Sequence, residues 1–246
     1  QAKTLFPYTT LFRSINFFND WIGVHMTYSH GWLDNQGSVI NSYLHQKTLY
    51  GRIGKPNSLF SLFGGLNHNA TWGGESKVKT GGIFDTYPGG LNTYFYVVTL
   101  LKDRNVVKID TNSTWDDTNG FYGNHLGSFD MAIKYQPQWG EVLLYKQTAY
   151  ETGRALSLAQ FNDGLVGLSV KLKKHRLINA ITVEYLYTAN QGNFISGFAQ
   201  LFKIRDPHLV EIENYYNNTR GGWQYMGKGI GSPLIIIDRE SSQGGG

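Results

Sequence analysis

The 246-residue sequence has no cysteine, only 6 prolines, and no apolar run near the roughly 18 residues that a membrane-spanning helix needs. Without thiols the chain forms no disulfide and no thiolate metal site, a composition that is compatible with the bacterial cell envelope. Charge of either sign is also sparse: 22 basic and 18 acidic residues leave a net charge of +4. The basic residues are scattered rather than gathered into a stripe, so we expect no nucleic-acid partner.

Glycine and tyrosine, by contrast, are abundant, with 30 and 16 copies. Residues 128–135, 166–173 and 181–188 alternate between apolar and polar side chains, and residues 141–150 do so less cleanly. Because side chains along a strand alternate between its two faces, each run predicts a β-strand with one apolar and one polar face.

The connections between these runs alternate in length. Residues 136–140 and 173–177 are short turns, whereas residues 103–126, 151–164 and 189–220 are long connections. Short turns at one end of a sheet and long loops at the other are typical of a transmembrane β-barrel. A strand of about nine residues spans roughly 30 Å, enough to cross an apolar band about 25 Å tall when tilted. We therefore expect an all-β fold: part of an antiparallel outer-membrane β-barrel, with its loops facing the cell exterior.

The rest of the chain predicts further elements of the same kind. Residues 15–33 predict one or two strands, followed by a turn at 34–37, a strand at 39–53 and a turn at 54–58. A returning strand is expected at 59–72, with a bulge or crowded point at Gly64 and Gly65. After it we expect a glycine-rich loop at 73–92, a strand or short helix at 93–101, a loop or strand margin at 212–223 and a last strand at 229–237.

The two ends of the chain are set apart from the barrel, which we expect over residues 15–240. The sequence has no initiator methionine and no signal peptide. Residues 6–14 (FPYTTLFRS) resemble the translated adapter read-through found at the edges of metagenomic reading frames, so we expect residues 1–14 to be a non-native leader. A natural polar tail is the alternative. Residues 241–246 are expected to be a flexible tail.

An ordered set of short motifs resembles the Bacteroidetes-type branch of the capsule assembly Wzi family. The motifs are YLHQK at 43–47, GGLNH at 64–68, WGG at 72–74, GNHLGS at 123–128, DGL at 163–165, EYL at 184–186, YYNN at 215–218, GWQY at 222–225 and GSPL at 231–234. The resemblance implies a monomeric outer-membrane barrel roughly twice as long as this chain, so that this chain would be an incomplete barrel fragment of about 9–12 strands. It also implies a role in holding capsular polysaccharide at the cell surface, with membrane lipid and surface polysaccharide as the partners.

Nine polar residues lie on or beside the predicted strands and are candidates for a lumenal polar network. They are His45, Lys47, Arg52, His68, Glu75, Asp130, Lys134, Lys171 and Glu184. A lysine or arginine facing lipid at mid-membrane would cost about 2–4 kcal/mol, so if the apolar face meets lipid these side chains face the lumen. They would form either a path for sugars or ions or a salt-bridged plug, and we favour the plug.

No metal site or cofactor is expected. The seven histidines follow no zinc-binding spacing. His45 and His68 could face each other across a hairpin, where a hydrogen-bonding role is favoured over metal binding. The glycines at 227–231 do not open a predicted helix and lack the spacing of a phosphate-binding loop.

Two of the long loops combine aromatic rings with carboxylates and amides, as glycan-binding surfaces do. The candidates are Trp115, Asp116, Asp117, Asn119, Phe121, Tyr122 and Asn124 in one loop, and Phe161, Asn162 and Asp163 in the other. Ordinary loop packing and anchoring at the membrane interface explain the same residues equally well. Asp116 and Asp117 are adjacent, which does not give the separation of a glycosidase pair, and we expect no catalytic activity.

Three functions therefore remain open. The first is a non-enzymatic outer-membrane barrel that attaches or assembles surface polysaccharide, and the second is a porin-like channel for small solutes or saccharides. The third is a soluble β-sandwich carbohydrate-binding module, in which the apolar face would close on a second sheet.

Overall fold

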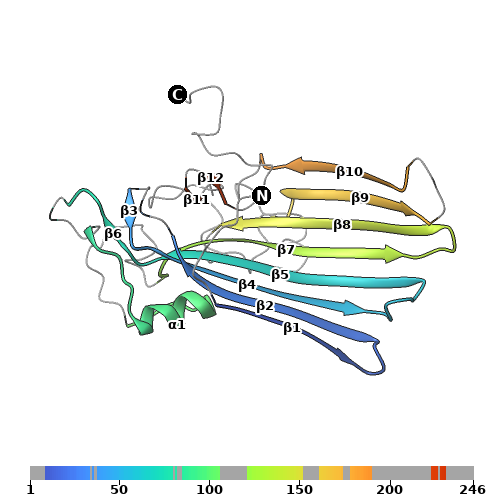
Figure 1. Cartoon of the computed structure of the whole chain (residues 1–246), viewed down its shortest axis with the longest axis horizontal. Coiled ribbons are helices and arrows are strands. Elements are labelled where there is room, and N and C mark those ends of the chain that lie inside the picture. Colours follow the sequence, from blue (N-terminus) through green and yellow to red (C-terminus); the bar gives the residue numbers. More distant parts are fainter. Residues whose placement is uncertain are drawn as a thin grey trace.

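The structure, a computed structural model, describes residues 9–33, 35, 38–79, 81, 85–105, 121–151, 161–173, 178–189, 223–226 and 228–230. Eight strands form one antiparallel sheet in which neighbours in space follow chain order (Figure 1). They are β1 (Thr9–Phe17), β2 (Ile22–Trp32), β4 (Tyr43–Ile53), β5 (Phe60–Trp72), β7 (Asn124–Tyr135), β8 (Gly140–Glu151), β9 (Gly164–Leu172) and β10 (Ala180–Tyr187).

Three smaller units accompany this sheet in the described part of the chain. Strand β3 (Val39–Ile40) pairs with β6 (Glu75–Ser76), and β11 (Gln224–Tyr225) pairs with β12 (Lys228–Gly229). Helix α1 (Leu91–Thr99) lies in the connection between β5 and β7. The predicted all-β, antiparallel fold class is confirmed, and the sheet is not closed, as in an incomplete barrel.

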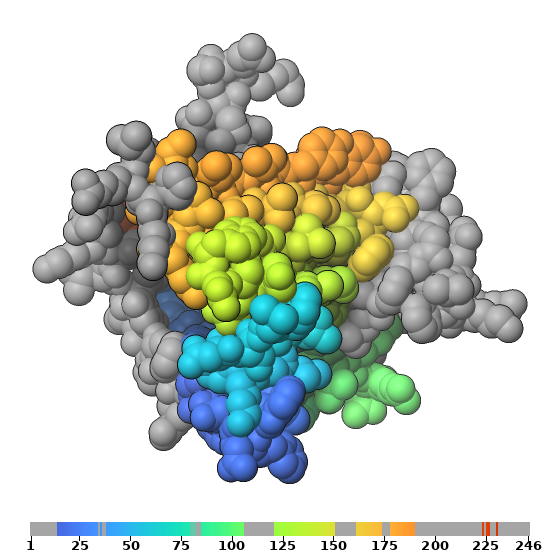
Figure 2. All heavy atoms as spheres, turned by 90° about the vertical axis from the view of Figure 1, so that its right-hand side faces the viewer, coloured from blue at the N-terminus to red at the C-terminus, as the bar shows by residue number. Residues whose placement is uncertain are grey.

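The predicted separation of turns and long connections is present. The hairpins β1–β2, β4–β5, β7–β8 and β9–β10 all turn at one end of the sheet, which we call the turn end. Figure 2 looks onto this end and shows the hairpins stacked in chain order. The first turn uses left-handed backbone at Phe18, Asn19 and Asp20, and the second uses Gly54 at φ 108°. Strands β2, β5 and β8 end, and β4, β7 and β9 begin, at the opposite end of the sheet, which we call the loop end (Figure 1).

The hairpins are staggered along the sheet. Phe17 and Ile22 are the last paired residues before the β1–β2 turn. The same row of cross-strand partners continues through Ile53 of β4 and Leu62 of β5 to Ile133 of β7. Beyond that row, β7 runs on to Tyr135 and β9 runs further still to Leu172. A progressive offset of this kind is what strands tilted within a curved sheet require.

The sheet has one apolar face and one polar face over the half near the turn end. Side chains of the apolar face are widely exposed there, with Ile53 at 60% and Val183 at 65%. Others of the same face that are exposed are Ile15, Leu49, Leu62, Met131, Ile133, Leu144, Val166, Leu168 and Ile181. The register places one row of this face along Ile15, Val24, Gly51, Gly64, Met131, Lys146, Val166 and Tyr185.

The packed core lies at the loop end, on both faces of the sheet. On the apolar face, Val97 of α1 packs with Ala70, Trp72 and Tyr122. On the polar face, Trp223 packs with Leu44 and Leu126. The half of the sheet near the turn end contains neither cluster.

Helix α1 decides between the strand and the helix predicted for residues 93–101. Thr93 and Val97, four residues apart, are buried toward the sheet, whereas Leu91 and Phe95 are exposed. This spacing is that of a helix, which begins after Gly90 and ends at Leu100 with φ 60°. In the described part of the chain, no helix has both the length and the apolar character to cross a bilayer.

Two other boundaries differ from the prediction. The strand expected at 39–53 is broken at Asn41, whose φ of 59° no strand tolerates, so β3 and β4 join different sheets. Part of the segment set apart as a leader belongs to the sheet, because β1 begins at Thr9 and pairs with β2. Predicted features at 1–8, 34, 36–37, 80, 82–84, 106–120, 152–160, 174–177, 190–222, 227 and 231–246 lie outside the described residues.

Candidate functional site

The most distinctive arrangement on the polar face is a tyrosine that lies over a glycine and reaches a carboxylate. Tyr50 of β4 pairs directly with Gly65 of β5, and Gly65 pairs with Asp130 of β7. A β-carbon on Gly65 would lie 2.1 Å from the Tyr50 ring, so the ring occupies the space that glycine leaves. The Tyr50 hydroxyl donates a hydrogen bond to Oδ2 of Asp130.

The same arrangement recurs on three other strands. Tyr145 of β8 pairs with Gly167 of β9, which pairs with Glu184 of β10. A β-carbon on Gly167 would lie 2.2 Å from the Tyr145 ring, and the Tyr145 hydroxyl donates to Oε1 of Glu184. An aromatic ring over a cross-strand glycine fixes strand register, so each tyrosine is held at a defined place on the polar face.

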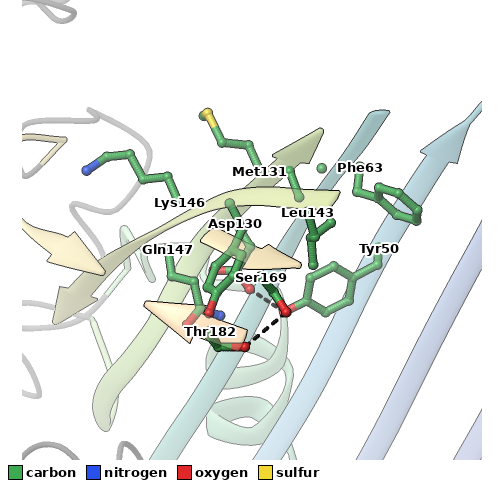
Figure 3. A pocket seen from close by; sticks show the side chains of 12 residues that line it. Tyr50, Phe63, Asp130, Met131, Leu143, Lys146, Gln147, Ser169 and Thr182 are labelled. Carbon is green, nitrogen blue, oxygen red and sulfur yellow. Dashed lines mark hydrogen bonds between the residues drawn. The ribbon is translucent and has the colours of Figure 1, made fainter. Parts of the chain in front are cut away.

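The two tyrosines border a cavity of about 360 Å³, which we call the polar-face pocket. Phe63, Asp130, Gln147 and Ser169 are among the other residues that line it. Thr182 Oγ1 lies 3.0 Å from Ser169 Oγ. Figure 3 shows Asp130, Gln147 and Tyr50 on one side of the sheet, with Met131 and Lys146 directed to the other. Oδ1 of Asp130 is buried and has no hydrogen-bond partner among the described residues.

The cations of the polar face are held at the turn end. Arg52 donates to the backbone carbonyls of Asp20 and Gly54. Lys134 lies over the Phe63 ring at 5.7 Å, and its ammonium donates to the carbonyl of Pro56 at 3.3 Å. The carboxylates of Asp130 and Glu184, in contrast, accept from tyrosine hydroxyls. The pocket lining therefore combines one carboxylate, that of Asp130, with hydroxyl and amide groups, and Lys134 lies over its Phe63 ring.

A row of four histidines crosses the apolar face at the loop end, beneath α1. His30, His45, His68 and His125 come from β2, β4, β5 and β7. Nδ1 of His30 and Nδ1 of His45 are 3.3 Å apart, and Nε2 of His68 lies 2.8 Å from Nδ1 of His125. The rings of His45 and His68 are fully buried, with centroids 5.7 Å apart.

One backbone carbonyl fixes the proton positions in half of this row. Nε2 of His125 donates to the carbonyl of Tyr122 at 2.9 Å, so a neutral His125 presents a bare Nδ1. That nitrogen accepts from Nε2 of His68, which leaves Nδ1 of a neutral His68 without a proton. Nδ1 of His68 and Nε2 of His45 are both buried without a hydrogen-bond partner among the described residues.

Two lysines of the apolar face carry their ammonium groups toward the loop end. Lys47 donates to the carbonyl of Val98 in the last turn of α1, where the helix dipole is negative. Lys146 lies over the Phe161 ring at 5.1 Å and donates to the carbonyl of Asp163 at 3.3 Å. A long side chain that extends along an apolar surface to a polar contact in this way is said to snorkel.

The structure divides the nine residues predicted to share a lumenal polar face. Arg52, Asp130, Lys134, Lys171 and Glu184 lie on the polar face, but His45, Lys47 and His68 lie on the face that carries the exposed apolar side chains. On that face, β4 carries His45 and Lys47 near the loop end, where α1 covers the sheet. Nearer the turn end, which α1 does not cover, the same face of β4 carries Leu49 and Ile53. Lys171 and Glu141 form an exposed ion pair at 3.5 Å.

Glu75, the ninth residue, lies in the two-stranded sheet of β3 and β6 rather than in the main sheet. It forms an ion pair with Lys79 at 2.8 Å and accepts from Asn41 at 3.2 Å. The hydrogen bond and the charge of Lys79 lower the pKa of Glu75 below its ordinary value of 4.5.

Of the predicted glycan-binding loop residues, Trp115, Asp116, Asp117 and Asn119 lie outside the described part of the chain. Tyr122 and Asp163 are buried, and Oδ1 of Asn124 accepts from Nε1 of Trp223 at 3.1 Å. Asn162 is exposed, Phe121 lies beneath the Lys102 ammonium at 5.3 Å and Phe161 beneath that of Lys146. Loop packing, one of the alternatives left open above, would make these contacts, and glycan binding by the two loops stays a prediction.

Tyr50, Tyr145 and their glycines were not among the predicted site residues. Tyr50 and Gly65 belong to one hairpin, so the short turn at 54–58 contained the signal for that pair. Among the described residues, no group of three or more histidine, aspartate or glutamate side chains is placed to hold a metal ion. The chain matches no known family model, no curated protein and no solved structure.

Proposed function

We propose that the protein is a non-enzymatic outer-membrane β-barrel that attaches or assembles surface polysaccharide. The observation that supports a membrane location is the bare apolar face. Large aliphatic side chains from β1 to β10 are exposed together on that face, and the opposite face carries the polar groups. A soluble sandwich would bury such a face on a second sheet, whereas the described residues that pack against it, α1 and Tyr122, lie at the loop end.

The aromatic side chains and the lysines support the same proposal. Trp21 and Trp139 are half exposed at the turn end, where a barrel carries an interfacial aromatic girdle. Lys47 and Lys146 would otherwise place a charge among the apolar side chains, at a cost of about 2–4 kcal/mol at the bilayer centre. Both instead direct their ammonium groups away from the exposed apolar side chains.

The polysaccharide role is supported by the polar-face pocket and by the resemblance of the sequence motifs to the capsule assembly Wzi family. Aromatic rings beside hydroxyl, amide and carboxylate groups suit the alternating apolar and hydroxyl-bearing surfaces of a sugar. A cavity of about 360 Å³ lies within the usual range of small-molecule sites.

The absence of native cysteine allows a direct test of membrane orientation. Ile133→Cys and Lys134→Cys place a fluorophore on adjacent residues of opposite faces. In bilayers that contain brominated lipid, the label at position 133 should be quenched and the label at position 134 should not. Equal behaviour of the two labels, with both in water, would reject the outer-membrane proposal.

The polysaccharide role is tested with the purified protein in nanodiscs and in planar bilayers. Binding to isolated surface glycans without ion conductance is the expected result. Conductance without glycan binding would favour the porin-like alternative instead.

A further inference from the structure

We propose that helix α1 lies in the headgroup layer of the bilayer at the loop end, and that Lys102 and Arg104 bind the phosphate groups of anionic lipids there. This inference rests on the proposed outer-membrane location and names the class of lipid that one part of the surface recognises. It is carried by the side of α1 that is turned away from the sheet, which is apolar and uncharged, and by the two exposed cations that follow the helix.

The side of α1 that is turned away from the sheet is built for contact with lipid. Thr93 and Val97 are buried toward the sheet, whereas Leu91 is 87% exposed and Phe95 is 55% exposed. Residues 86–101 contain no charged side chain. A helix at a water-facing surface normally carries charged and polar residues on its outer side. Large apolar side chains without any charge on that side suit the boundary between headgroups and acyl chains instead.

The position of α1 along the sheet agrees with this assignment. The helix packs against Ala70 and Trp72 of β5 at the loop end, whereas Leu62 of the same strand is exposed near the turn end. From Leu62 to Ala70 the strand rises roughly 26 Å, which is about 20 Å of height at a tilt of about 40°. The apolar band of an outer-membrane barrel is about 25 Å tall and is flanked by aromatic side chains. Trp32, which is half exposed and in ring contact with Tyr43, lies at the same end. A band that begins near Leu62 therefore ends close to α1.

The charged residues that follow the helix are separated by sign. Lys102 and Arg104 are exposed, whereas Asp103 between them is buried. Oδ2 of Asp103 accepts from the Tyr122 hydroxyl at 3.0 Å, and Oδ1 accepts from the backbone N–H of Asn105 at 2.9 Å. Positive charge is therefore presented at the surface next to α1, and the one carboxylate of this segment is satisfied inside the protein.

Lipid phosphate is the anion that these two cations suit. The Lys102 ammonium lies over the Phe121 ring, which supplies no hydrogen-bond acceptor, and a phosphate oxygen would supply one. The guanidinium of an arginine such as Arg104 pairs with phosphate through two parallel hydrogen bonds. Near an anionic membrane surface each such cation contributes about fivefold in affinity.

The test uses the whole chain, which has no native cysteine, in phosphatidylcholine nanodiscs. A fluorophore on Phe95→Cys is quenched when brominated lipid contacts it. Brominated phosphatidylglycerol should reach half-maximal quenching at a proportion at least fivefold lower than brominated phosphatidylcholine does. Lys102→Gln combined with Arg104→Gln should bring the two proportions together. Leu91→Cys provides a second label position on the same side of α1 if the first label perturbs the helix.

The matched control is Lys171→Gln combined with Lys173→Gln, which removes the same charge from two exposed residues at the turn end. This variant should keep the fivefold difference. The inference is overturned if the control loses the difference, if the double variant at 102 and 104 keeps it, or if neither lipid quenches the label on α1. The Ile133→Cys label distinguishes this failure from failure of the outer-membrane proposal. Quenching at position 133 alone leaves that proposal standing, whereas labels in water at both positions reject it.

Discussion

The ring of Tyr50 fills the space above Gly65, so that neither residue can be changed without affecting the other. Gly65→Ala would place a methyl group 2.1 Å from a ring carbon. Overpacking of this kind costs about 1–3 kcal/mol, and we expect a loss of that size in the free energy of unfolding. Denaturant titration in detergent measures it.

Gly51→Ala is the matched control for that substitution. Gly51 lies in the neighbouring strand on the apolar face, where the nearest atom to a new β-carbon would be 3.8 Å away. We expect its free energy of unfolding to change by less than that of Gly65→Ala. Equal losses in the two variants would mean that strand geometry, not the Tyr50 ring, sets the cost.

The two Tyr–Gly–carboxylate arrangements differ in solvent exposure, so their tyrosine–carboxylate hydrogen bonds should contribute differently to the free energy of unfolding. Asp130 has one buried oxygen, whereas Glu184 lies on β10, which is exposed throughout. Tyr50→Phe should therefore destabilise the fold by about 1–3 kcal/mol, because it leaves a buried carboxylate with one bond fewer. Tyr145→Phe should cost less, since water replaces the lost hydroxyl. Thermal unfolding of both variants decides, and an equal or reversed order would contradict the prediction.

The histidine row should contribute to stability through His68. This ring is fully buried and bonded to His125 at 2.8 Å. His68→Ala removes a buried ring and leaves its partner unsatisfied, which should cost about 2–5 kcal/mol. His25→Ala, on the polar face of β2, serves as the comparison and should cost less in the same denaturant titration. A loss at position 25 as large as at position 68 would argue against the row as a stabilising unit.

Helix α1 should depend on the side chain that faces the sheet. Val97 is completely buried, whereas Phe95 is 55% exposed on the opposite side of the helix. Val97→Ala should leave a cavity and raise hydrogen exchange of amides 91–99, and Phe95→Ala should leave exchange nearly unchanged. Mass-spectrometric exchange resolves this segment. Faster exchange in Phe95→Ala than in Val97→Ala would mean that the side of α1 that carries Phe95, not the side that carries Val97, makes the stabilising contacts.

The ion pair of Glu75 and Lys79 gives a pH-dependent prediction. Because Lys79 lowers the pKa of Glu75, the pair contributes above the ordinary glutamate value of 4.5 and is lost as the pH falls through the lower folded value. NMR titration of the Glu75 side chain should therefore give a midpoint below 4.5 that rises toward 4.5 in Lys79→Ala. A midpoint that does not move would show that Asn41 alone holds the carboxylate.

Much of the sheet could be predicted because alternation and turn length are local properties. The runs at 128–135, 141–150, 166–173 and 181–188 fall within β7, β8, β9 and β10 or end within one residue of them. The turn at 136–140 could be read for the same reason. Crowding at Gly65 was also predicted, although its cause, the Tyr50 ring, depends on strand register.

What could not be predicted depends on contacts between distant segments. Alternation assigns His45 and Lys47 to the same face as Leu49, but it does not reveal that α1 covers one part of that face and leaves the other bare. The pairing of Tyr145 with Gly167 crosses a long connection, so no short-range pattern contains it. The left-handed backbone at Asn41 likewise has no signal in the alternation around it.

The stagger of the hairpins has a geometrical consequence for any experiment that measures depth. Direct cross-strand partners such as Met131 and Lys146 share a rung of the ladder, but the rungs slope relative to the axis around which the sheet curls. Positions of equal height therefore follow a diagonal through the sheet. A probe confined to one height would leave the rung on which it starts and, from β1 to β10, mark residues progressively farther from that rung toward the hairpin tips.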